Sequence, residues 1–410
     1  MAEARAASGG GKPVIGVGMV GYAFMGAAHS QGWRTVGRVF DLPVAPVMAA
    51  ISGRDGGAAQ AAADRLGWAA VETDWRALIE RDDVQLVDIG APGDLHAPIA
   101  IAALRAGKHV LCEKPLANTV AEAEAMAAAA ATARAAGQVA MVGFNYRRVP
   151  AIALARQLVE QGRIGTLRHA RASYLQDWLA DPAFSLTWRL QAEHAGSGAL
   201  GDLGAHIVDL AQYLSGELIT GVSGVSTTFT TRRPLPGGDG HGEVTVDDAV
   251  LVTARLGSGA LASLEATRFA TGRKNALRIE LNGSAGSLAF DLERLNELEF
   301  CDGTEASGTL LSSPERSPTA GFRRILVTEP GHPYLSAWWP PGHTLGWEHT
   351  FSHQFRDLLL AIADGTQPSP SFADGLQVQR VLAAVAASAA GGSAWTPVPQ
   401  PVPPQVSQPD

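Results

Sequence analysis

The feature that most constrains the fold is a glycine-containing turn between a short apolar run and a helix-forming run. Residues 14–20 read VIGVGMV and residues 21–26 read GYAFMG. This spacing is that of the G-x-G-x-x-G turn, in which the first glycine permits a tight turn and the third permits close helix–strand packing. Ala23 replaces the middle glycine, with a single methyl group as the obstruction. Such a turn can serve packing alone or can hold a dinucleotide at the helix N-terminus. In the second case the binding residues are Gly21, Ala23, Phe24 and Met25.

The chain after this turn alternates short apolar runs with alanine-rich helical stretches. The strand-like runs are residues 14–20, 47–51, 86–89, 109–112 and 139–143. The helical stretches include residues 58–66, 98–106 and 120–136. Strands separated by helices indicate βαβ units with right-handed crossovers and a parallel sheet. Residues 13–145 are therefore predicted to form a doubly wound α/β Rossmann domain, with ligands at the carboxyl edge of its sheet.

The pattern changes after about Tyr146. A helix at residues 151–160 leads to a strand-like run at 167–174 and to a glycine-rich helix start near Gly201. Further strand-like runs follow at residues 218–229, 248–256, 260–267, 277–281 and 287–290. Runs without intervening helices favour a largely antiparallel sheet. With two late helices, at 348–363 and 372–389, residues 146–396 are predicted to form a second, α+β domain that binds the substrate. The late helices can pack back on the first domain.

Length and charge narrow the class of protein. A chain of 410 residues, 46% of them hydrophobic, favours two domains over one. A net charge of −8 argues against a nucleic-acid partner, which requires a basic face. Only Cys112 and Cys301 are cysteines, so neither a disulfide framework nor a cysteine-based zinc site is expected. His349 and His353 have helical spacing but no H-E-x-x-H pattern, and we predict no metal.

The two ends of the chain have the composition of unstructured segments. Residues 1–12 lack a basic start followed by an apolar stretch, so we predict a flexible leader rather than a signal peptide. Residues 397–410 are proline-rich and are predicted to form an extended or disordered tail. No segment is apolar and long enough to span a bilayer. These observations predict a cytoplasmic protein with no membrane partner.

The end of the second predicted strand bears on cofactor preference. An acidic residue is expected there to hold the ribose hydroxyls of NAD. The sequence instead reads Ser52-Gly53-Arg54-Asp55. Ser52 and Arg54 can hold the 2′-phosphate of NADP, whereas Asp55 can still reach the ribose, and a solvated loop is equally compatible. The residues therefore leave NAD and NADP both open.

Two further motifs contain side chains that can take part in catalysis. A predicted strand ends in Glu113-Lys114-Pro115, at the sheet edge where an α/β fold binds its ligands. Asp202 and His206 are four residues apart in GDLGAH, so on a helix they share one face. Each residue alone has an ordinary interpretation. Lys114 could lie at the surface, Asp202 could cap a helix, and His206 could be a core histidine.

Together, in this order, the motifs resemble the Gfo/Idh/MocA oxidoreductase family. The resemblance spans residues 13–395 and implies a Rossmann domain followed by an open-faced sheet domain. It matches Lys114, Asp202 and His206 to the family's catalytic lysine, aspartate and histidine. The stretches FNYRRVPAIALA (144–155), YLQDWLADP (174–182) and PSFADGLQV (370–378) resemble members that oxidise the C3 hydroxyl of a pyranose with NAD.

The resemblance also implies cofactor contacts beyond the first turn. Ala91-Pro92-Gly93 stands where the family has T-P-N, so an asparagine contact is lost, and His96 is retained. A cis peptide bond between Lys114 and Pro115 is expected. The remaining cofactor-binding residues are then predicted to be Ser52, Arg54, Ala91, Pro92, His96, Glu113, Lys114 and Asn145.

Alcohol oxidation assigns roles to the three catalytic residues. His206 suits the base because its unperturbed pKa lies near neutrality. Lys114 can stabilise negative charge on the oxygen, which makes a metal unnecessary. Asp202 can orient the imidazole or hold a neighbouring sugar hydroxyl. Strand alternation places Tyr174, Gln176 and Trp178 on one face. The predicted substrate contacts are Lys114, Arg147, Tyr174, Gln176, Trp178, Arg189, Asp202, His206 and His332.

The sequence therefore predicts an NAD(P)-dependent oxidoreductase that oxidises a secondary hydroxyl, at C3, of a pyranose, anhydrosugar or glycoside. Redox-assisted glycoside cleavage, inositol oxidation and a non-catalytic sugar or nucleotide sensor are the alternatives. A sensor is expected to lack the lysine or the histidine, and both are present. The family resemblance also implies a homodimer or homotetramer formed through the open sheet.

Overall fold

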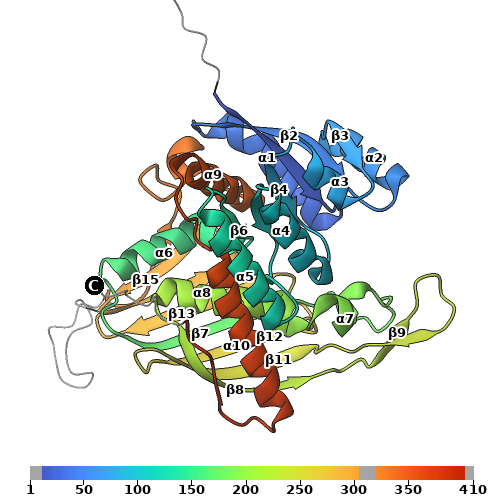
Figure 1. Cartoon of the computed structure of the whole chain (residues 1–410). Helices are drawn as coiled ribbons and strands as arrows, with labels where there is room; N and C mark the ends of the chain where they lie inside the picture. The colour runs from blue at the N-terminus through green and yellow to red at the C-terminus, as the bar shows by residue number, and fades with distance from the viewer. Residues whose placement is uncertain (1–11, 304–318, 402–410) are drawn as a thin grey trace, which may run out of the picture.

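The structure is a computed structural model of the whole chain that describes residues 12–303 and 319–401. A first domain with a parallel sheet lies at the top of Figure 1, above a second domain built on a larger sheet. The predicted fold class is confirmed. The leader falls outside the described residues except for Lys12, which pairs with Asp41 at the surface.

The first domain contains a six-stranded parallel sheet with the order β3-β2-β1-β4-β5-β6. Its strands are β1 (Val14–Val20), β2 (Ala45–Ser52), β3 (Ala70–Glu72), β4 (Leu86–Ile89), β5 (His109–Cys112) and β6 (Ala140–Val142). Its helices are α1 (Phe24–Val39), α2 (Gly56–Leu66), α3 (Trp75–Glu80), the 3-10 turn η1 (Gly93–Leu95), α4 (His96–Arg105) and α5 (Val120–Arg134). The strand order reverses between β1 and β4, and this switch point is where doubly wound sheets bind their ligands.

The second domain contains a nine-stranded sheet with the order β16-β15-β14-β13-β7-β12-β11-β8-β17. Its strands are β7 (Leu167–Leu175), β8 (Ile219–Thr227), β11 (Ala249–Leu256), β12 (Leu261–Thr267), β13 (Ala276–Gly283), β14 (Gly286–Asp291), β15 (Glu297–Asp302), β16 (Arg323–Leu326) and β17 (Thr396–Pro397). All pairings are antiparallel except that of β7 with β12. A separate hairpin, β9 (Arg232–Pro234) and β10 (His241–Glu243), extends from this domain in Figure 1.

Helices cover one face of the nine-stranded sheet, between it and the first domain (Figure 1). They are α6 (Pro150–Glu160), α8 (Ala205–Ser215) and α10 (Phe372–Ala390), with the short α7 (Ala192–Ala195) beside them. The 3-10 turns are η2 (Asn145–Arg148), η3 (Trp188–Leu190), η5 (Leu292–Arg294) and η6 (Leu335–Ala337), and a π-helical turn, η4 (Leu200–Gly204), leads into α8. Every second residue of β11 and β12 is buried under these helices, and the residues between them are exposed on the other face of the sheet.

The two late helices connect the domains. Helix α9 (His349–Asp364) packs on α1, where Phe355 stacks on Trp33 with ring centroids 3.9 Å apart. Helix α10 contacts both α5 of the first domain and β8 of the second. The start of the predicted tail is extended and packs on the second domain, because β17 pairs with β8 and Val398 is buried. Residues 402–410 of that tail lie outside the described residues.

Candidate active site

The turn after β1 has the geometry of a phosphate-binding turn. Gly21 has φ of +99°, and a Cβ built there would lie 2.8 Å from the Gly90 carbonyl oxygen. A Cβ at Gly26 would lie 2.3 Å from the Gly21 carbonyl oxygen, so α1 packs against the turn only because residue 26 is glycine. Ala23 caps α1 without a side-chain hydrogen bond, which leaves the first N–H groups of a 16-residue helix for a ligand. These residues fit the pyrophosphate of a dinucleotide.

The residues that bear on cofactor preference, at the end of β2 and in the loop after it, have different structural roles. Asp55 accepts a hydrogen bond from the Ala58 amide at 3.0 Å and caps α2, so its carboxylate has a local structural role. Arg54 is exposed. The hydrogen bond to Asp94 raises the pKa of the nearby His194, and the charge of Arg54 opposes this rise. Ser52 is buried, and its carbonyl oxygen accepts a hydrogen bond from the Gly21 amide at 3.0 Å.

The turns after β4 and β5 are joined by His96. Its buried ring lies between the carbonyl oxygens of Ala91, at 3.0 Å, and Pro115, at 2.9 Å. Pro92 starts the 3-10 turn η1 beside it. Asn145 is buried at the start of η2 and donates a hydrogen bond to the Thr350 hydroxyl at 2.9 Å, so its amide nitrogen holds α9.

Glu113 belongs to a buried ionic cluster that the sequence analysis did not identify. The His29 ring, on α1, lies 2.9 Å from both carboxylate oxygens of Asp88 and 3.1 Å from Glu113 Oε1. Trp33 donates a further hydrogen bond to Asp88 at 2.7 Å. Burial acts to lower the pKa of His29, but the two carboxylates outweigh it and raise that pKa to about 10. His29 is therefore a buried cation, and Glu113 Oε2 accepts a hydrogen bond from the Lys114 amide.

Lys114 reaches from the first domain to the second. Its ammonium donates to the Asp202 carbonyl oxygen at 2.8 Å and to the Asp202 carboxylate at 3.2 Å. The side chain is 14% exposed, which excludes the interpretation as a surface lysine. The peptide bond between Lys114 and Pro115 is cis. Two predicted catalytic residues, 88 positions apart, are thus in direct contact.

Asp202 lies in the π-helical turn η4 rather than at a helix cap. The N-terminal end of this segment is held by Asp247, whose two carboxylate oxygens accept hydrogen bonds from the amides of Gly198 and Leu200, both at 2.8 Å. Burial acts to raise the pKa of Asp202, but the charges of Lys114, Arg268 and Arg189 outweigh it and lower that pKa. Asp202 is therefore ionised at neutral pH.

His206 lies one turn further on, in a pocket of aromatic rings. Its ring centroid is 4.6 Å from that of Tyr146, 5.7 Å from that of Tyr174 and 6.1 Å from that of Phe144. Burial, followed by the charge of Lys114, lowers the pKa of His206 well below its usual value. The imidazole is therefore neutral at pH 7. Its Nδ1 is buried, and no described residue hydrogen-bonds to it.

A hydrogen-bonded set of side chains borders His206. The hydroxyls of Tyr146 and Tyr174 are 2.8 Å apart, and Tyr174 donates to Asn275 Oδ1 at 2.7 Å. Gln176 donates to the same oxygen at 2.7 Å. Tyr146 and Asn275 were missed by the sequence analysis. Tyr146 is in FNYRRVPAIALA beside the selected Arg147, whereas Asn275 lies in no motif that was considered.

The predicted substrate residues Arg189 and Trp178 have different surroundings. Arg189 stacks over Trp188 and, with the fully buried Arg268, acts on Asp202. Strand β7 ends at Leu175, so the predicted alternation does not extend to Trp178. The Trp178 ring instead packs in a small apolar cluster and faces Arg268, whose guanidinium carbon is 5.5 Å from its centroid.

Two predicted substrate residues are not brought to this centre. Arg147 is buried and hydrogen-bonded to both oxygens of the Asp209 carboxylate, so its charge is already paired. The His332 imidazole accepts a hydrogen bond from the Glu329 amide in a loop of the C-terminal part. Neither side chain hydrogen-bonds to Lys114, Asp202 or His206.

The described residues contain neither a metal-binding cluster nor a membrane-spanning helix. No group of three or more histidine, cysteine, aspartate or glutamate side chains there could hold a metal ion. No helix in the described ranges is long and apolar enough to cross a membrane.

Comparisons with known proteins agree with this geometry. Residues 15–144 match the model of the oxidoreductase family with an NAD-binding Rossmann fold, and residues 152–289 match that of the GFO/IDH/MocA C-terminal domain. Levoglucosan dehydrogenase of Pseudarthrobacter phenanthrenivorans is 42% identical over 94% of this chain and 98% of its own length.

Solved structures give the same result. An oxidoreductase domain protein from Kribbella flavida is 63% identical, with a TM-score of 0.90, over 95% of this chain and all of that one. A levoglucosan dehydrogenase in complex with NADH and levoglucosan is 42% identical, with a TM-score of 0.87, over 94% of this chain and all of that one. With a glycine turn after β1 and a contact of Lys114 with Asp202 between the domains, this chain belongs to the Gfo/Idh/MocA family and is an oxidoreductase.

Proposed function

We propose that this enzyme is an NAD-dependent sugar dehydrogenase that oxidises a secondary hydroxyl, at C3, of a pyranose, anhydrosugar or glycoside to a ketone. The observation that carries the proposal is the contact of Lys114 with Asp202 beside a neutral His206. An ammonium and an unprotonated imidazole in one partly closed site are the two groups that alcohol oxidation requires. The likeness to levoglucosan dehydrogenase over almost the whole chain supports a sugar substrate.

Lys114, Asp202 and His206 would have different roles at the substrate hydroxyl. His206 accepts the hydroxyl proton, and its lowered pKa keeps it in the neutral form that can do so. Lys114 donates a hydrogen bond to the same oxygen and stabilises the negative charge that develops there. Asp202 holds the Lys114 ammonium in position and has a second oxygen for a neighbouring sugar hydroxyl. A nicotinamide held beside this centre would supply the hydride acceptor, so that loss of the hydroxyl proton to His206 and of a hydride from the carbon would leave a carbonyl.

The sugar ring would be held by polar groups around this centre. Tyr174, Gln176 and Asn275 form one connected set of donors and acceptors. Arg189 would supply a guanidinium near Asp202. Trp178 would present an apolar ring to the sugar face. Arg147 and His332 are left out of this proposed sugar site.

Residues at the turns after β1, β4 and β5 would hold the dinucleotide. The free amides of Phe24 and Met25 would bind the pyrophosphate, with Gly21 and Ala23 close to it. Ala91, Pro92, His96 and Glu113 would line the nicotinamide half, with Asn145 fixing η2. NAD is favoured by the matched domain and by relatives that bind NADH. Ser52 and Arg54 are the positions at which NADP would be discriminated.

The exposed face of the nine-stranded sheet would be the surface on which the chain forms a homodimer or homotetramer. It contains a shallow depression of about 980 Å³, bordered by residues of β7, β8, β11, β12, β13, β14 and β15. Val225, Leu251 and Leu261 expose about half of their side chains there or close by. Exposed apolar side chains on an open sheet face are a feature of protein–protein interfaces, which supports this assignment.

The decisive experiment follows the reduction of NAD and of NADP by absorbance with levoglucosan, glucose, methyl glycosides and inositols. We expect turnover with one sugar class, lost in Lys114→Ala and unchanged in the surface control Lys12→Ala. Silence across the panel, with cofactor retained in the purified protein, would instead indicate redox-assisted glycoside cleavage or a sensor. Turnover of inositols alone would indicate an inositol dehydrogenase.

A further inference from the structure

The first turn of α1 exposes an aromatic side chain at the edge of the proposed pyrophosphate site. Phe24 is the first residue of this helix and is 65% exposed, more than any other large hydrophobic residue in the described ranges. The proposed pyrophosphate site uses only its backbone amide. The ring is therefore free to contact another part of a bound dinucleotide.

Trp347 stacks on the Phe24 ring. The two rings are nearly parallel, with an interplanar angle of 10° and centroids 5.5 Å apart. Trp347 also packs edge-on against Phe351, with centroids 4.8 Å apart, and the fully buried Phe351 packs on the His29 ring of α1. The stack is therefore continuous with the core between α1 and α9.

The position of Trp347 is fixed from the second domain. Asn296, which precedes β15, hydrogen-bonds to both the amide and the carbonyl oxygen of Leu345, each at 2.9 Å. The Trp347 carbonyl oxygen accepts a hydrogen bond from the Thr350 hydroxyl at 2.7 Å. Trp347 thus brings an aromatic ring of the second domain to the turn after β1.

The aromatic side chains on either side of Ala23 contact different elements. The Tyr22 ring lies against Gly53, in the loop after β2, where a Cβ would be 1.9 Å from the ring. That loop is the one proposed to hold the adenosine ribose. Phe24 instead contacts the residue two positions before α9. Its ring is therefore directed to the other half of the proposed cofactor site.

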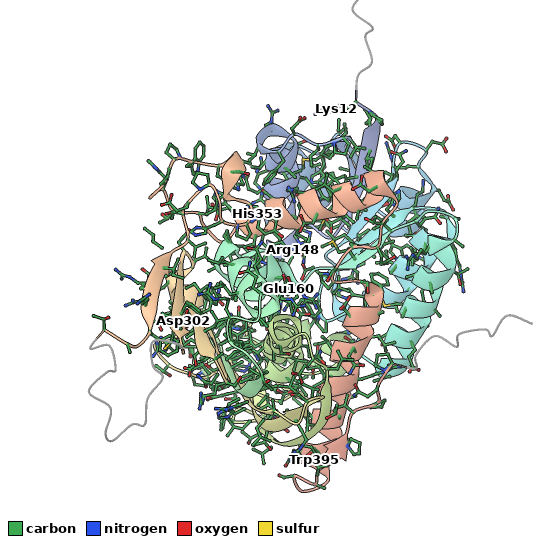
Figure 2. The ribbon with its side chains drawn as sticks, turned by 90° about the vertical axis from the view of Figure 1, so that its left-hand side faces the viewer. Lys12, Arg148, Glu160, Asp302, His353 and Trp395 are labelled. Carbon is green, nitrogen blue, oxygen red and sulfur yellow. The ribbon has the colours of Figure 1, made fainter. Side chains whose placement is uncertain are left out.

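Helix α9 also adjoins η2, the turn beside the catalytic centre. Asn145 donates to the Thr350 hydroxyl at 2.9 Å, and the Arg148 carbonyl oxygen is 2.9 Å from the His353 ring. Figure 2 labels Arg148 and His353, which mark this junction. The same turn contributes the tyrosine that packs on His206. The stack therefore lies between the turn after β1 and the turn that lines the catalytic pocket.

We propose that Phe24 and Trp347 are positioning residues for the nicotinamide half of the bound dinucleotide. Trp347 holds the Phe24 ring by stacking on it, and the exposed part of that ring forms an apolar wall for the nicotinamide. An aromatic ring suits this role because it offers a large and rigid apolar surface. This role rests on the proposed function, which supplies the dinucleotide, and adds a residue of the second domain to its site.

Binding of NADH and of ADP-ribose to the full chain, measured by isothermal titration calorimetry, tests the proposal. ADP-ribose contains the pyrophosphate and both riboses but no nicotinamide. We expect Phe24→Ala to weaken NADH binding at least about tenfold and Trp347→Leu about threefold, with the Kd for ADP-ribose unchanged in both. Because Trp347 acts through Phe24, the double variant is expected to bind NADH no more weakly than Phe24→Ala alone.

Two further variants separate the stack from effects on folding. Trp347→Phe keeps an aromatic ring next to Phe24 and is expected to bind NADH as the wild type does. Trp339→Leu removes a tryptophan that is 55% exposed and packs near Trp338 rather than Phe24, and it is expected to change neither Kd. Should Trp347→Leu fail to fold, Phe24→Ala still decides, because the replaced side chain is exposed.

Two results would overturn this inference alone. The first is wild-type affinity for NADH in Phe24→Ala. The second is an equal loss of affinity for NADH and ADP-ribose, which would mean that the substitution damages the pyrophosphate turn. The dehydrogenase proposal would stand in both cases, because the wild type would still bind NADH. If the wild type bound neither compound, the proposed function and this inference would fail together.

Discussion

Replacement of His29 by leucine tests whether the ionic cluster below Lys114 stabilises the first domain. The His29 imidazolium lies between Asp88 and Glu113, and its side chain is fully buried. Leucine fills a similar volume but leaves two buried carboxylates without their cation. Breaking a buried ion pair by removing one partner costs about 3–5 kcal/mol.

The pKa of His29 gives a second value for the same quantity. A rise from 6.5 to about 10 is worth about 5 kcal/mol at full effect, at about 1.4 kcal/mol per pKa unit. Because the folded-state pKa is the higher one, this stabilisation is complete below pH 6.5 and is lost as the pH rises towards 10. Between pH 7 and pH 9 the wild type is expected to lose about 2.5 kcal/mol of unfolding free energy through this group.

Urea unfolding, followed by tryptophan fluorescence, measures both effects. Trp33, one of nine tryptophans, donates to Asp88, so part of the signal comes from the cluster itself. His29→Leu is expected to lower the free energy of unfolding at pH 7 by about 4 kcal/mol and to remove most of its decrease between pH 7 and 9. The matched control is His353→Leu. Burial lowers the pKa of His353 to about 3, so that residue is neutral throughout this range.

The two variants therefore separate a buried charge from a buried ring. His353→Leu loses hydrogen bonds to Trp338 and to the Arg148 carbonyl oxygen, so it is less stable than the wild type but keeps the same alkaline slope. If His29→Leu retained the wild-type slope between pH 7 and 9, His29 would be neutral in the folded protein. The cluster would then be a hydrogen-bonded one without a buried cation.

Three further predictions concern the catalytic centre and the proposed cofactor site. Burial and Lys114 lower the pKa of His206, so kcat/KM for oxidation is expected to be constant around neutral pH and to fall only below pH 6.5. A fall of kcat/KM with a midpoint above pH 7 would contradict His206 as the base. Arg54→Asp is expected to raise the KM for NADP at least about tenfold and leave that for NAD unchanged, and an equal response would remove Arg54 from the cofactor site. Gly26→Ala is expected to weaken NAD binding and to lower the free energy of unfolding by about 1–3 kcal/mol, because its Cβ would collide with the Gly21 carbonyl oxygen. Calorimetry measures both quantities, and unchanged values would show that the turn adapts.

The fold was predictable because hydrophobic periodicity and turn residues act locally. The predicted runs at 14–20, 86–89 and 109–112 are strands with those bounds in the structure. Most of the missed strands are short or exposed, although β15 has six residues and buries Leu298 and Phe300. β3 has three residues of intermediate exposure, and β16 is exposed at three of its four residues. Such segments have no buried face and therefore no apolar alternation in the sequence.

The site was only partly predictable because its shape depends on contacts between distant segments. Lys114, Asp202 and His206 stand in recognisable motifs, and the structure brings them together. Arg147 and Tyr146 are adjacent in the sequence, and the choice between them depends on the direction in which each points from η2. Arg147 meets Asp209 there, whereas Tyr146 meets His206. No periodicity or spacing contains that information.

The dependence on distant contacts extends to the whole catalytic set. Lys114 belongs to the first domain and Asp202 to the second, so their hydrogen bond exists only while the domains keep one relative position. That position is maintained by α9, through Asn145–Thr350 and the Trp33–Phe355 stack, and by α10, which contacts α5 and β8. The residues that align the lysine with the histidine therefore include segments more than 140 positions beyond His206. Substitutions in α9 and α10 that loosen these contacts should lower kcat even though neither helix supplies any of the three catalytic residues.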